Sequence, residues 1–346
     1  MTNSGRQEAV NQSMQGDDAR ELGDFASAAS HYAEAADLYR KLGDDTGLAF
    51  ALTNQGAAAR RLGDFASAAA LCGEAADLFR KLGEEKLLAL ALSSQGFAAA
   101  AQGDFASAAT HHAEAADLFR KLGDDTGRAL ALTDQGVAAG ELGDSASAAA
   151  LCSEAADLYR KLGDDTGLAA ALYNQGVAAR KLGDFASAAT HDGEAADLLR
   201  KLGDDTGLAL ALTEQGVAAR AQGDFASAAM HFGEAAGLYR KLGDDTGLAH
   251  ALNIQGVAAR RLGDFASAAT HHAEAADLFR KLGDDTGLAS ALNSQGIAAS
   301  ELGGFASAAT HHAEAADLFR KLGDDEGAAR TRDLQAELTR HLEGQN

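Results

Sequence analysis

Hydrophobic positions recur along the chain at steps of three and four residues, in segments separated by short turns that contain glycine and aspartate. The segment that starts at Thr46 has an inward stripe formed by Leu48, Leu52, Gln55, Ala59 and Leu62. The segment that starts at Asp64 has a stripe formed by Phe65, Ala68, Cys72, Ala75, Phe79 and Leu82. Such steps suit one face of an α-helix and exclude a strand. Both segments are therefore predicted to be amphipathic helices.

The ends of these helices are marked by residues that favour helix termination. Asp64 is placed to cap the second segment, and Asp45 or Thr46 to cap the first. Gly63 and Gly83 follow the segments, where a left-handed residue ends a helix. The glycines are thus predicted to end helices. They do not form a phosphate-binding loop, since neither G-x-x-x-x-G-K-[ST] nor G-x-G-x-x-G occurs.

The pair of segments repeats with a period of 40 residues and no insertion. Phenylalanine follows Gly-Asp or Gly-Gly at residues 25, 65, 105, 185, 225, 265 and 305, and Ser145 takes the remaining place. Helix pairs in such an array bury their apolar faces by stacking on their neighbours. We therefore predict an all-α solenoid of eight 40-residue repeats and a closing helix.

The repeat resembles a known family in the order Leu52, Gly56, Gly63-Asp64-Phe65, Ala68, Ala75. This order is similar to the signature of the tetratricopeptide repeat (TPR). The 40-residue unit also resembles the repeats of the LGN/Pins group of cell-polarity adaptors and of many bacterial regulators. The resemblance implies a right-handed superhelical α-solenoid of antiparallel helix pairs.

The expected organisation is a single solenoid domain over residues 1–346. We expect an N-terminal capping helix of the first repeat at 9–22, repeats of period 40 over 23–323, and a C-terminal capping helix at 324–343. One departure from the family pattern is the glutamine at Gln55, which recurs in every copy. A buried amide needs hydrogen-bond partners. We therefore hypothesise a ladder of hydrogen bonds through Gln15, Gln55, Gln95 and their equivalents.

The copies differ from one another mainly on one face of the first helix, at positions equivalent to 50, 53, 54, 57, 60 and 61. In tetratricopeptide repeat proteins the first helices line the concave surface, where extended peptides lie. The resemblance therefore implies a peptide-binding set: Phe50, Thr53, Asn54, Arg60, Arg61, Phe97, Tyr173, Asn174, Arg180, Lys181, Arg220, Asn253, Arg260 and Arg261. The alternative is that exposed positions vary without any ligand.

Basic residues at the ends of these first helices contrast with the rest of the chain. Lys and Arg number 30 against 51 Asp and Glu, a net charge of −21. Such a surface repels nucleic acid and anionic membranes. A basic stripe within it favours an acidic peptide, with arginines on its carboxylates and asparagines on its backbone. The rival explanation is compensation of the helix dipole, worth only ~0.3–1 kcal/mol for each residue.

Motifs of catalysis are scarce, so we expect a non-catalytic protein-interaction scaffold that uses no cofactor. The chain lacks Gly-x-Ser-x-Gly, His-Glu-x-x-His and Cys-x-x-Cys. It has no signal-like segment and no spanning run, and Cys72 and Cys152 are expected to be reduced core thiols, which suits the cytoplasm. We expect a monomer or weak homo-oligomer. The near-perfect repetition leaves an alternative, a self-assembling spacer that forms oligomers or filaments.

The stretch ATHHAEAADLFRKLGDD, from Ala109, contains adjacent histidines that resemble metal ligands. Neighbouring residues on a helix diverge by about 100°. We therefore expect His112 to enter the apolar stripe and His111 to lie on its flank. Glu114 recurs whether or not histidines precede it, and so belongs to the repeat. No metal site is predicted. The alternative is a metal bridging the histidine pairs at 271–272 and 311–312, which lie in neighbouring repeats.

Overall fold

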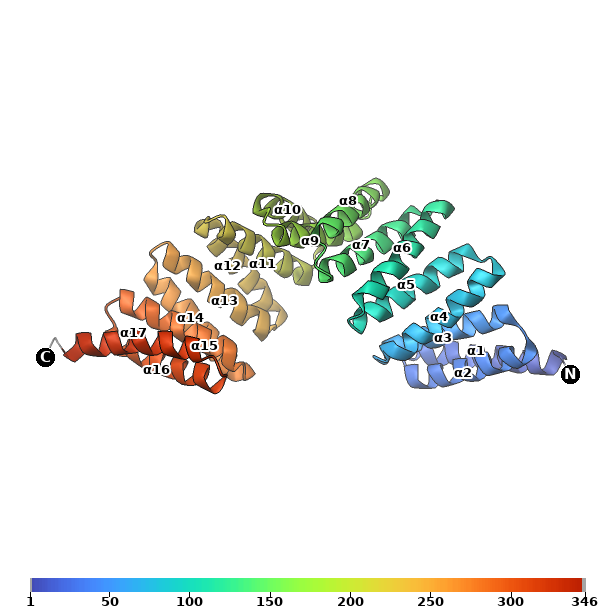
Figure 1. The fold of residues 1–346 in the computed structure, drawn as a ribbon, viewed down its shortest axis with the longest axis horizontal. Coiled ribbons are helices and arrows are strands. Elements are labelled where there is room, and N and C mark those ends of the chain that lie inside the picture. Colours follow the sequence, from blue (N-terminus) through green and yellow to red (C-terminus); the bar gives the residue numbers. More distant parts are fainter. Residues whose placement is uncertain (1, 344–346) are drawn as a thin grey trace. The chain divides into compact units, whose positions relative to one another are not determined.

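The computed structural model describes residues 2–343, and these form 17 α-helices (Figure 1). The helices fall into two compact units, one ending at Leu182 and the other beginning at Gly183. In both units, odd-numbered helices are the first helices of the repeats and even-numbered helices are the second helices.

The N-terminal unit contains nine of the described helices. Its first helices are α1 (Thr2–Glu21), α3 (Asp45–Arg61), α5 (Glu85–Ala101), α7 (Asp125–Glu141) and α9 (Asp165–Lys181). Its second helices are α2 (Phe25–Leu42), α4 (Phe65–Leu82), α6 (Phe105–Leu122) and α8 (Ser145–Leu162).

The C-terminal unit begins with a second helix and ends with a first helix. Its second helices are α10 (Phe185–Leu202), α12 (Phe225–Leu242), α14 (Phe265–Leu282) and α16 (Phe305–Lys321). Its first helices are α11 (Asp205–Ala221), α13 (Asp245–Arg261), α15 (Asp285–Glu301) and α17 (Asp325–Glu343).

Within each unit, every helix packs antiparallel on the helices before and after it, which confirms the predicted all-α solenoid. Successive first helices also meet: α3 contacts α5, α5 contacts α7, α7 contacts α9, and α13 contacts α15. Among the described residues, successive second helices make no contact of this extent. The first helices therefore lie on the inner side of the curve of each unit.

Helix caps confirm part of the predicted pattern and correct the rest. The Asp64 carboxylate accepts a hydrogen bond from the Ser67 backbone N–H at 3.0 Å, as an N-cap does. The cap of α3 is Asp44, which accepts from the Gly47 N–H at 3.0 Å, and so the choice of Asp45 or Thr46 was wrong. Asp45 instead opens the helix. Gly63 and Gly83 have φ of 79° and 75°, the left-handed conformation expected of them.

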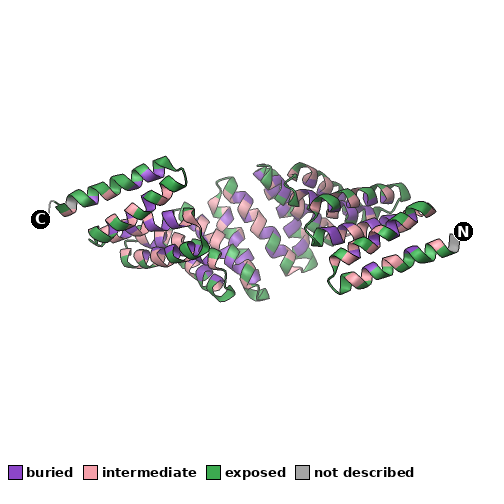
Figure 2. Cartoon of the chain, turned by 90° about the horizontal axis from the view of Figure 1, so that it is seen from below, coloured by how far each residue is buried: buried purple, intermediate pink, exposed green. Residues whose placement is uncertain are grey.

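The core consists of narrow stripes of alanine, leucine and aromatic side chains where helices face one another (Figure 2). Leu52 and Phe79 are almost completely buried, as expected. Leu62 is 52% exposed and Leu82 is 37% exposed, so their assignment to the inward stripes was wrong. Leu62 follows the last residue of α3 and Leu82 is the last residue of α4, so neither is covered by a neighbouring turn on all sides.

The hypothetical glutamine ladder is not formed. Within residues 2–343 no hydrogen bond joins the glutamines at Gln15, Gln55 and Gln95 to one another, and Gln55 is only half-buried. The Gln95 amide instead lies on Gly73 of the preceding second helix, since a Cβ built at Gly73 would come within 2.9 Å of Gln95 Nε2. Partial exposure leaves water as the partner of these amides.

Close packing of first on second helices depends on a glycine in the middle of first helices such as α3, α5 and α11. A Cβ built at Gly216 would lie 2.9 Å from the Phe232 ring. Because this ring is fully buried, we expect Gly216→Ala to lower the free energy of unfolding by ~1–3 kcal/mol. Gly237 on α12 has no atom within 4 Å of such a Cβ, and Gly237→Ala should raise stability by ~0.5–1 kcal/mol. Urea unfolding of both variants checks the opposite signs, and a stabilised Gly216→Ala protein would contradict the packing.

Candidate functional site

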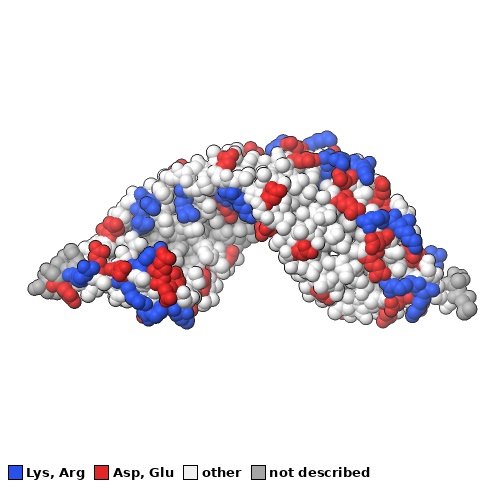
Figure 3. Space-filling view, in the orientation of Figure 1, with Lys and Arg blue, Asp and Glu red and all other residues white. Residues whose placement is uncertain are grey.

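The exposed surface of the second helices, here called the second-helix face, carries charges that neutralise one another. Arg80 donates to Asp77 Oδ1 at 2.8 Å and to Glu114 Oε1 of the next second helix at 2.9 Å. The same bridge to the next repeat recurs at Arg40–Glu74, Arg200–Glu234, Arg240–Glu274 and Arg280–Glu314. Figure 3 shows basic and acidic atoms side by side along the margin of the N-terminal unit.

Lysines add a second set of bridges, between second helices and the first helices before them. Lys81 Nζ lies 2.6 Å from Asp45 Oδ2, and the spacing of 36 residues recurs at Lys161–Asp125, Lys241–Asp205, Lys281–Asp245 and Lys321–Asp285. Sequence reasoning missed both sets of bridges. Their signal was the invariant spacing of the charged residues across repeats.

The first helices expose a different surface, here called the first-helix face: the positions equivalent to 50, 53, 54, 57, 60 and 61. Its arginines differ from those of the second helices. Within the described residues no carboxylate pairs with a set of five of them, namely Arg60, Arg61, Arg220, Arg260 and Arg261. These cations are therefore available to a carboxylate from outside the chain.

Three of these arginines lie over aromatic rings. The guanidinium of Arg60 is 4.9 Å from the centre of the Phe97 ring, and that of Arg61 is 5.1 Å from the Phe25 ring. Arg261 lies 5.7 Å from the Phe225 ring. Stacking on a ring leaves the N–H edges of a guanidinium free, because the planar fork donates in its own plane. The rings thus hold the donors in place.

Apolar side chains are also exposed on the first-helix face of the N-terminal unit. Phe50 is 46% exposed and packs edge-on against Phe79, with 5.7 Å between ring centres, while Phe97 is 45% exposed. Leu90 and Leu130 occupy the position of Phe50 on α5 and α7 and are exposed too. The predicted set did not include these two leucines. Position 50 had been identified as variable among the copies, and Leu90 was one of the residues on the variable face.

Several predicted site residues are engaged within the chain. Asn253 Oδ1 lies 2.9 Å from His272 Nδ1, and Asn174 Nδ2 donates to the Ala170 carbonyl at 3.0 Å. Lys181 Nζ donates to the Gly140 carbonyl and lies 3.6 Å from a carboxylate oxygen of Glu141. These contacts weaken the case for their direct role in binding.

The remaining predicted residues lie on first helices of both units. The Thr53 hydroxyl donates to the Ala49 carbonyl at 2.8 Å. Thr53, Asn54, Tyr173 and Arg180 are half-buried. The structure thus brings Arg60 and Phe97 together, and in the C-terminal unit it places Arg220 on α11 and Arg260 and Arg261 on α13, two successive first helices.

The histidine pair follows the prediction made from helix geometry. His112 is buried and His111 is half-buried on the flank. Burial lowers the pKa of His112 and of His272 to about 4, with neighbouring positive groups adding to the effect. In the part of the chain that the structure describes, no group of three or more His, Cys, Asp or Glu side chains is arranged to hold a metal ion.

Both cysteines, Cys72 and Cys152, are free and buried. Burial raises the pKa of each thiol to about 11, so neither is a reactive thiolate at neutral pH.

Of the helices within residues 2–343, none combines the length and the apolar character that crossing a bilayer requires.

Comparison with known proteins supports the family indicated by the repeat. The profile described as "Tetratricopeptide repeat" matches residues 8–81, 167–241 and 247–321. No curated protein matches the chain at a significant level.

Similar solved structures share the fold at low sequence identity. The apo form of RapI has a TM-score of 0.59 at 13% identity, covering 86% of this chain and 99% of its own. The apo form of the quorum sensor NprR from B. thuringiensis has a TM-score of 0.54 at 13% identity, covering 94% and 99%. A Rap protein complexed with competence and sporulation factor has a TM-score of 0.51 at 15% identity, covering 99% and 100%.

Proposed function

Because the chain belongs to the tetratricopeptide repeat family, we propose that it is a non-catalytic scaffold whose first-helix face binds an extended acidic segment of a partner protein. The observation that carries this proposal is the difference between the two sets of arginines. Second-helix arginines such as Arg80 are paired with carboxylates, whereas Arg60, Arg220 and Arg260 are not. A protein of net charge −21 that leaves cations unpaired on one face favours an acidic ligand there.

The exposed arginines and apolar side chains of the first-helix face suit a peptide with both acidic and apolar residues. Charge-assisted hydrogen bonds to arginine are the stronger kind, and the guanidinium fork adds geometric selectivity. In the N-terminal unit, Phe50, Leu90 and Leu130 offer exposed apolar surface on successive first helices. Alternating contacts of these two kinds along an extended chain give specificity for one sequence.

A protein of similar fold gives independent support. The Rap protein in the comparison was solved in complex with competence and sporulation factor, so an array of this fold has a documented binding partner. We propose a cytoplasmic location, because the two cysteines are buried free thiols. We also propose that the protein is a monomer or weak homo-oligomer.

Selection from a random dodecapeptide library tests the proposal. The immobilised protein should enrich peptides that carry several Asp or Glu residues together with apolar residues, and added salt should weaken their binding because exposed ion pairs are screened. Enrichment of basic peptides, or no enrichment over a bare support, would contradict an acidic ligand.

One observation favours the second candidate, a self-assembling spacer. Leucines at the turns after first helices are exposed in series, with Leu62, Leu142 and Leu182 between 52% and 55% exposed. Such a row of apolar side chains is a possible contact between copies. Sedimentation velocity over a wide concentration range separates the two functions: the scaffold keeps a constant mass, while a spacer grows with concentration.

A further inference from the structure

A small pocket of about 50 Å³ lies on the first-helix face of the N-terminal unit, between α7, α8 and α9. Val137, Gly140 and Val177 line it, and all three occupy positions of that face. Ala148 of α8 also lines it. Six of its nine lining residues are Gly, Ala or Val, so its walls are mainly apolar.

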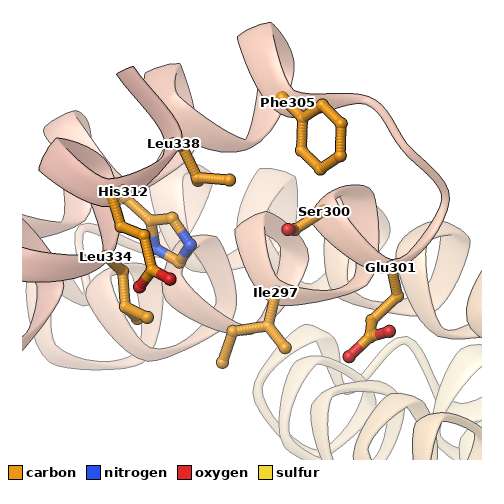
Figure 4. A pocket seen from close by; sticks show the side chains of 8 residues that line it. Ile297, Ser300, Glu301, Phe305, His312, Leu334 and Leu338 are labelled. Atoms are coloured by element: carbon orange, nitrogen blue, oxygen red, sulfur yellow. The ribbon is translucent and has the colours of Figure 1, made fainter. Parts of the chain in front are cut away.

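The pocket exists because residue 140 has no side chain. At the equivalent position of α3, Arg60 lies over the ring of Phe97 on α5. On α7 and α9 the equivalent residues are Gly140 and Val177, so the space over Val177 stays open. The last repeat shows the same relation. Ser300 takes that position, and a pocket of about 330 Å³ lies between α15, α16 and α17 (Figure 4).

Packing between helices does not require a glycine at residue 140. A Cβ built at Gly140 would meet the Ala148 Cβ at 3.6 Å, an ordinary van der Waals contact. By contrast, a Cβ at Gly136, one turn earlier, would lie 2.7 Å from Cys152 Sγ. Glycine is also a poorer helix former than alanine. Gly140 therefore weakens its helix without relieving a clash, and what it provides is the open pocket.

A second replacement in the same repeat sets the position of Lys181 beside the pocket. In an earlier repeat the equivalent basic residue, Arg61, lies 5.1 Å from the centre of the Phe25 ring. The residue that corresponds to this phenylalanine for Lys181 is Ser145, which has no ring. Lys181 Nζ instead donates to the Gly140 carbonyl at 2.9 Å, and the lysine side chain lines the pocket.

The three polar residues that line the pocket already have partners within the chain. Asn174 Nδ2 donates to the Ala170 carbonyl at 3.0 Å. Lys181 donates to the Gly140 carbonyl and lies 3.6 Å from a carboxylate oxygen of Glu141. A polar ligand would have to break these contacts in order to form its own. The pocket therefore favours an apolar ligand.

The volume of the pocket limits the side chain that it can hold. A space of about 50 Å³ exceeds the ~10–15 Å³ that one water molecule requires, whereas an apolar cavity known to bind benzene measures about 150 Å³. The pocket thus suits a small branched side chain and is too small for an aromatic ring.

We propose that this pocket binds one valine or leucine side chain of the peptide that occupies the first-helix face. The methyl groups contact Val137 and Val177, in the place that the Arg60 side chain takes in its own repeat. Burial of apolar surface in this contact stabilises the complex. The site rests on the proposed function, since the side chain comes from the same peptide, and it adds a sequence preference that charge alone does not give.

A double-mutant cycle between the pocket and a dodecapeptide selected on the wild-type protein tests the site. An alanine scan of the peptide should find one valine or leucine whose replacement weakens binding to the wild type at least about tenfold, because buried methyl groups are lost. Gly140→Leu fills the pocket with the chain's own side chain. On that variant the same alanine replacement should change the affinity less than about twofold. Fluorescence anisotropy measures every combination.

Xenon tests the pocket without any peptide, since it binds small apolar cavities. It should shift the methyl NMR signals of Val137 and Val177 in the wild type, and Gly140→Leu should abolish the shift. Gly237→Leu is the matched control, because a Cβ at Gly237 on α12 meets no atom within 4 Å. Its responses to xenon and to the peptide should equal those of the wild type.

A variant with Arg220, Arg260 and Arg261 changed to glutamate separates this site from the acidic-peptide function. It should lose affinity for the peptide and keep the xenon shift, so failure of one proposal can be told from failure of the other. Absence of a xenon shift in the wild type would overturn the pocket. A scan without such a valine or leucine, or an equal effect of its replacement on the wild type and on Gly140→Leu, would overturn its occupant.

Discussion

Changing Arg220, Arg260 and Arg261 to glutamate is expected to weaken binding of a selected acidic peptide by at least about 100-fold. The three side chains lie on α11 and α13, successive first helices of one unit, and none has a carboxylate partner among the described residues. A hydrogen bond to a charged group contributes about 1.5–3 kcal/mol, and each 1.4 kcal/mol is about tenfold in affinity. Loss of two such contacts gives the stated effect, before any repulsion is counted.

The matched control changes the same charge on the second-helix face of the same unit. Lys241, Lys281 and Lys321 are exposed and paired with aspartates, and such surface pairs contribute only ~0–1 kcal/mol to stability. Their replacement by glutamate should change peptide affinity less than about threefold, since these side chains lie away from the first-helix face. Fluorescence anisotropy with a labelled peptide measures both variants. Equal losses in the two would mean that only net charge matters.

Acid is expected to destabilise the C-terminal unit through His272. Burial and the nearby positive groups Arg260 and His271 lower the pKa of His272 to about 4, whereas an unfolded histidine titrates near 6.5. Between these values the unfolded chain binds a proton that the folded chain does not. The stability that comes from neutral His272 is therefore complete above about pH 6.5 and is lost as pH falls toward 4, at ~1.4 kcal/mol for each pH unit.

His312 adds to the same trend, because burial also lowers its pKa. At His112 a neighbouring carboxyl group opposes the effect of acid on stability. It lies 4.0 Å from Asp134, whose pKa is raised by burial to about 6. A raised carboxyl pKa favours the folded state at low pH and opposes the histidine in the same window. The loss of folding stability in acid is therefore assigned to His272.

A double variant that copies a neighbouring repeat tests the origin of the acid effect. Phe232 occupies the slot of His272 and is fully buried, and Thr213 takes the place of Asn253 beside it. Changing His272→Phe together with Asn253→Thr should reduce the slope of stability against pH by ~1.4 kcal/mol per unit between pH 6.5 and 4. Urea unfolding at several pH values measures the slope. An unchanged slope would assign the acid effect to other groups.

The fold was predictable because local signals agree with one another in every repeat. The 40-residue period, the Asp64 cap and the left-handed Gly63 each point to the same helix boundaries, and packing only moved the cap of α3 to Asp44. Leu62 was misplaced because the hydrophobic pattern continues past the end of the helix. Periodicity identifies a face but does not show where coverage by the neighbouring helix stops.

The candidate site was less predictable from the sequence, because the hydrogen bonds and ion pairs of its side chains depend on how neighbouring helices stack on one another. Asn253 was expected to contact a ligand, but the next helix places His272 within hydrogen-bond distance. The pairing of Arg80 with Glu114 spans 34 residues and so depends on the stacking of repeats.

Photo-cross-linking tests most directly whether the first-helix face is the binding surface. Benzoylphenylalanine replaces the exposed Leu210 on α11 or the exposed His250 on α13, the first helices that carry Arg220 and Arg260, or the exposed Met230 on the second helix α12. Each protein is irradiated with the selected acidic peptide, and the covalent product is quantified by mass spectrometry. We predict cross-links from positions 210 and 250 and none above background from position 230. Efficient cross-linking at 230 with none at 210 and 250 would contradict the first-helix face as the binding surface.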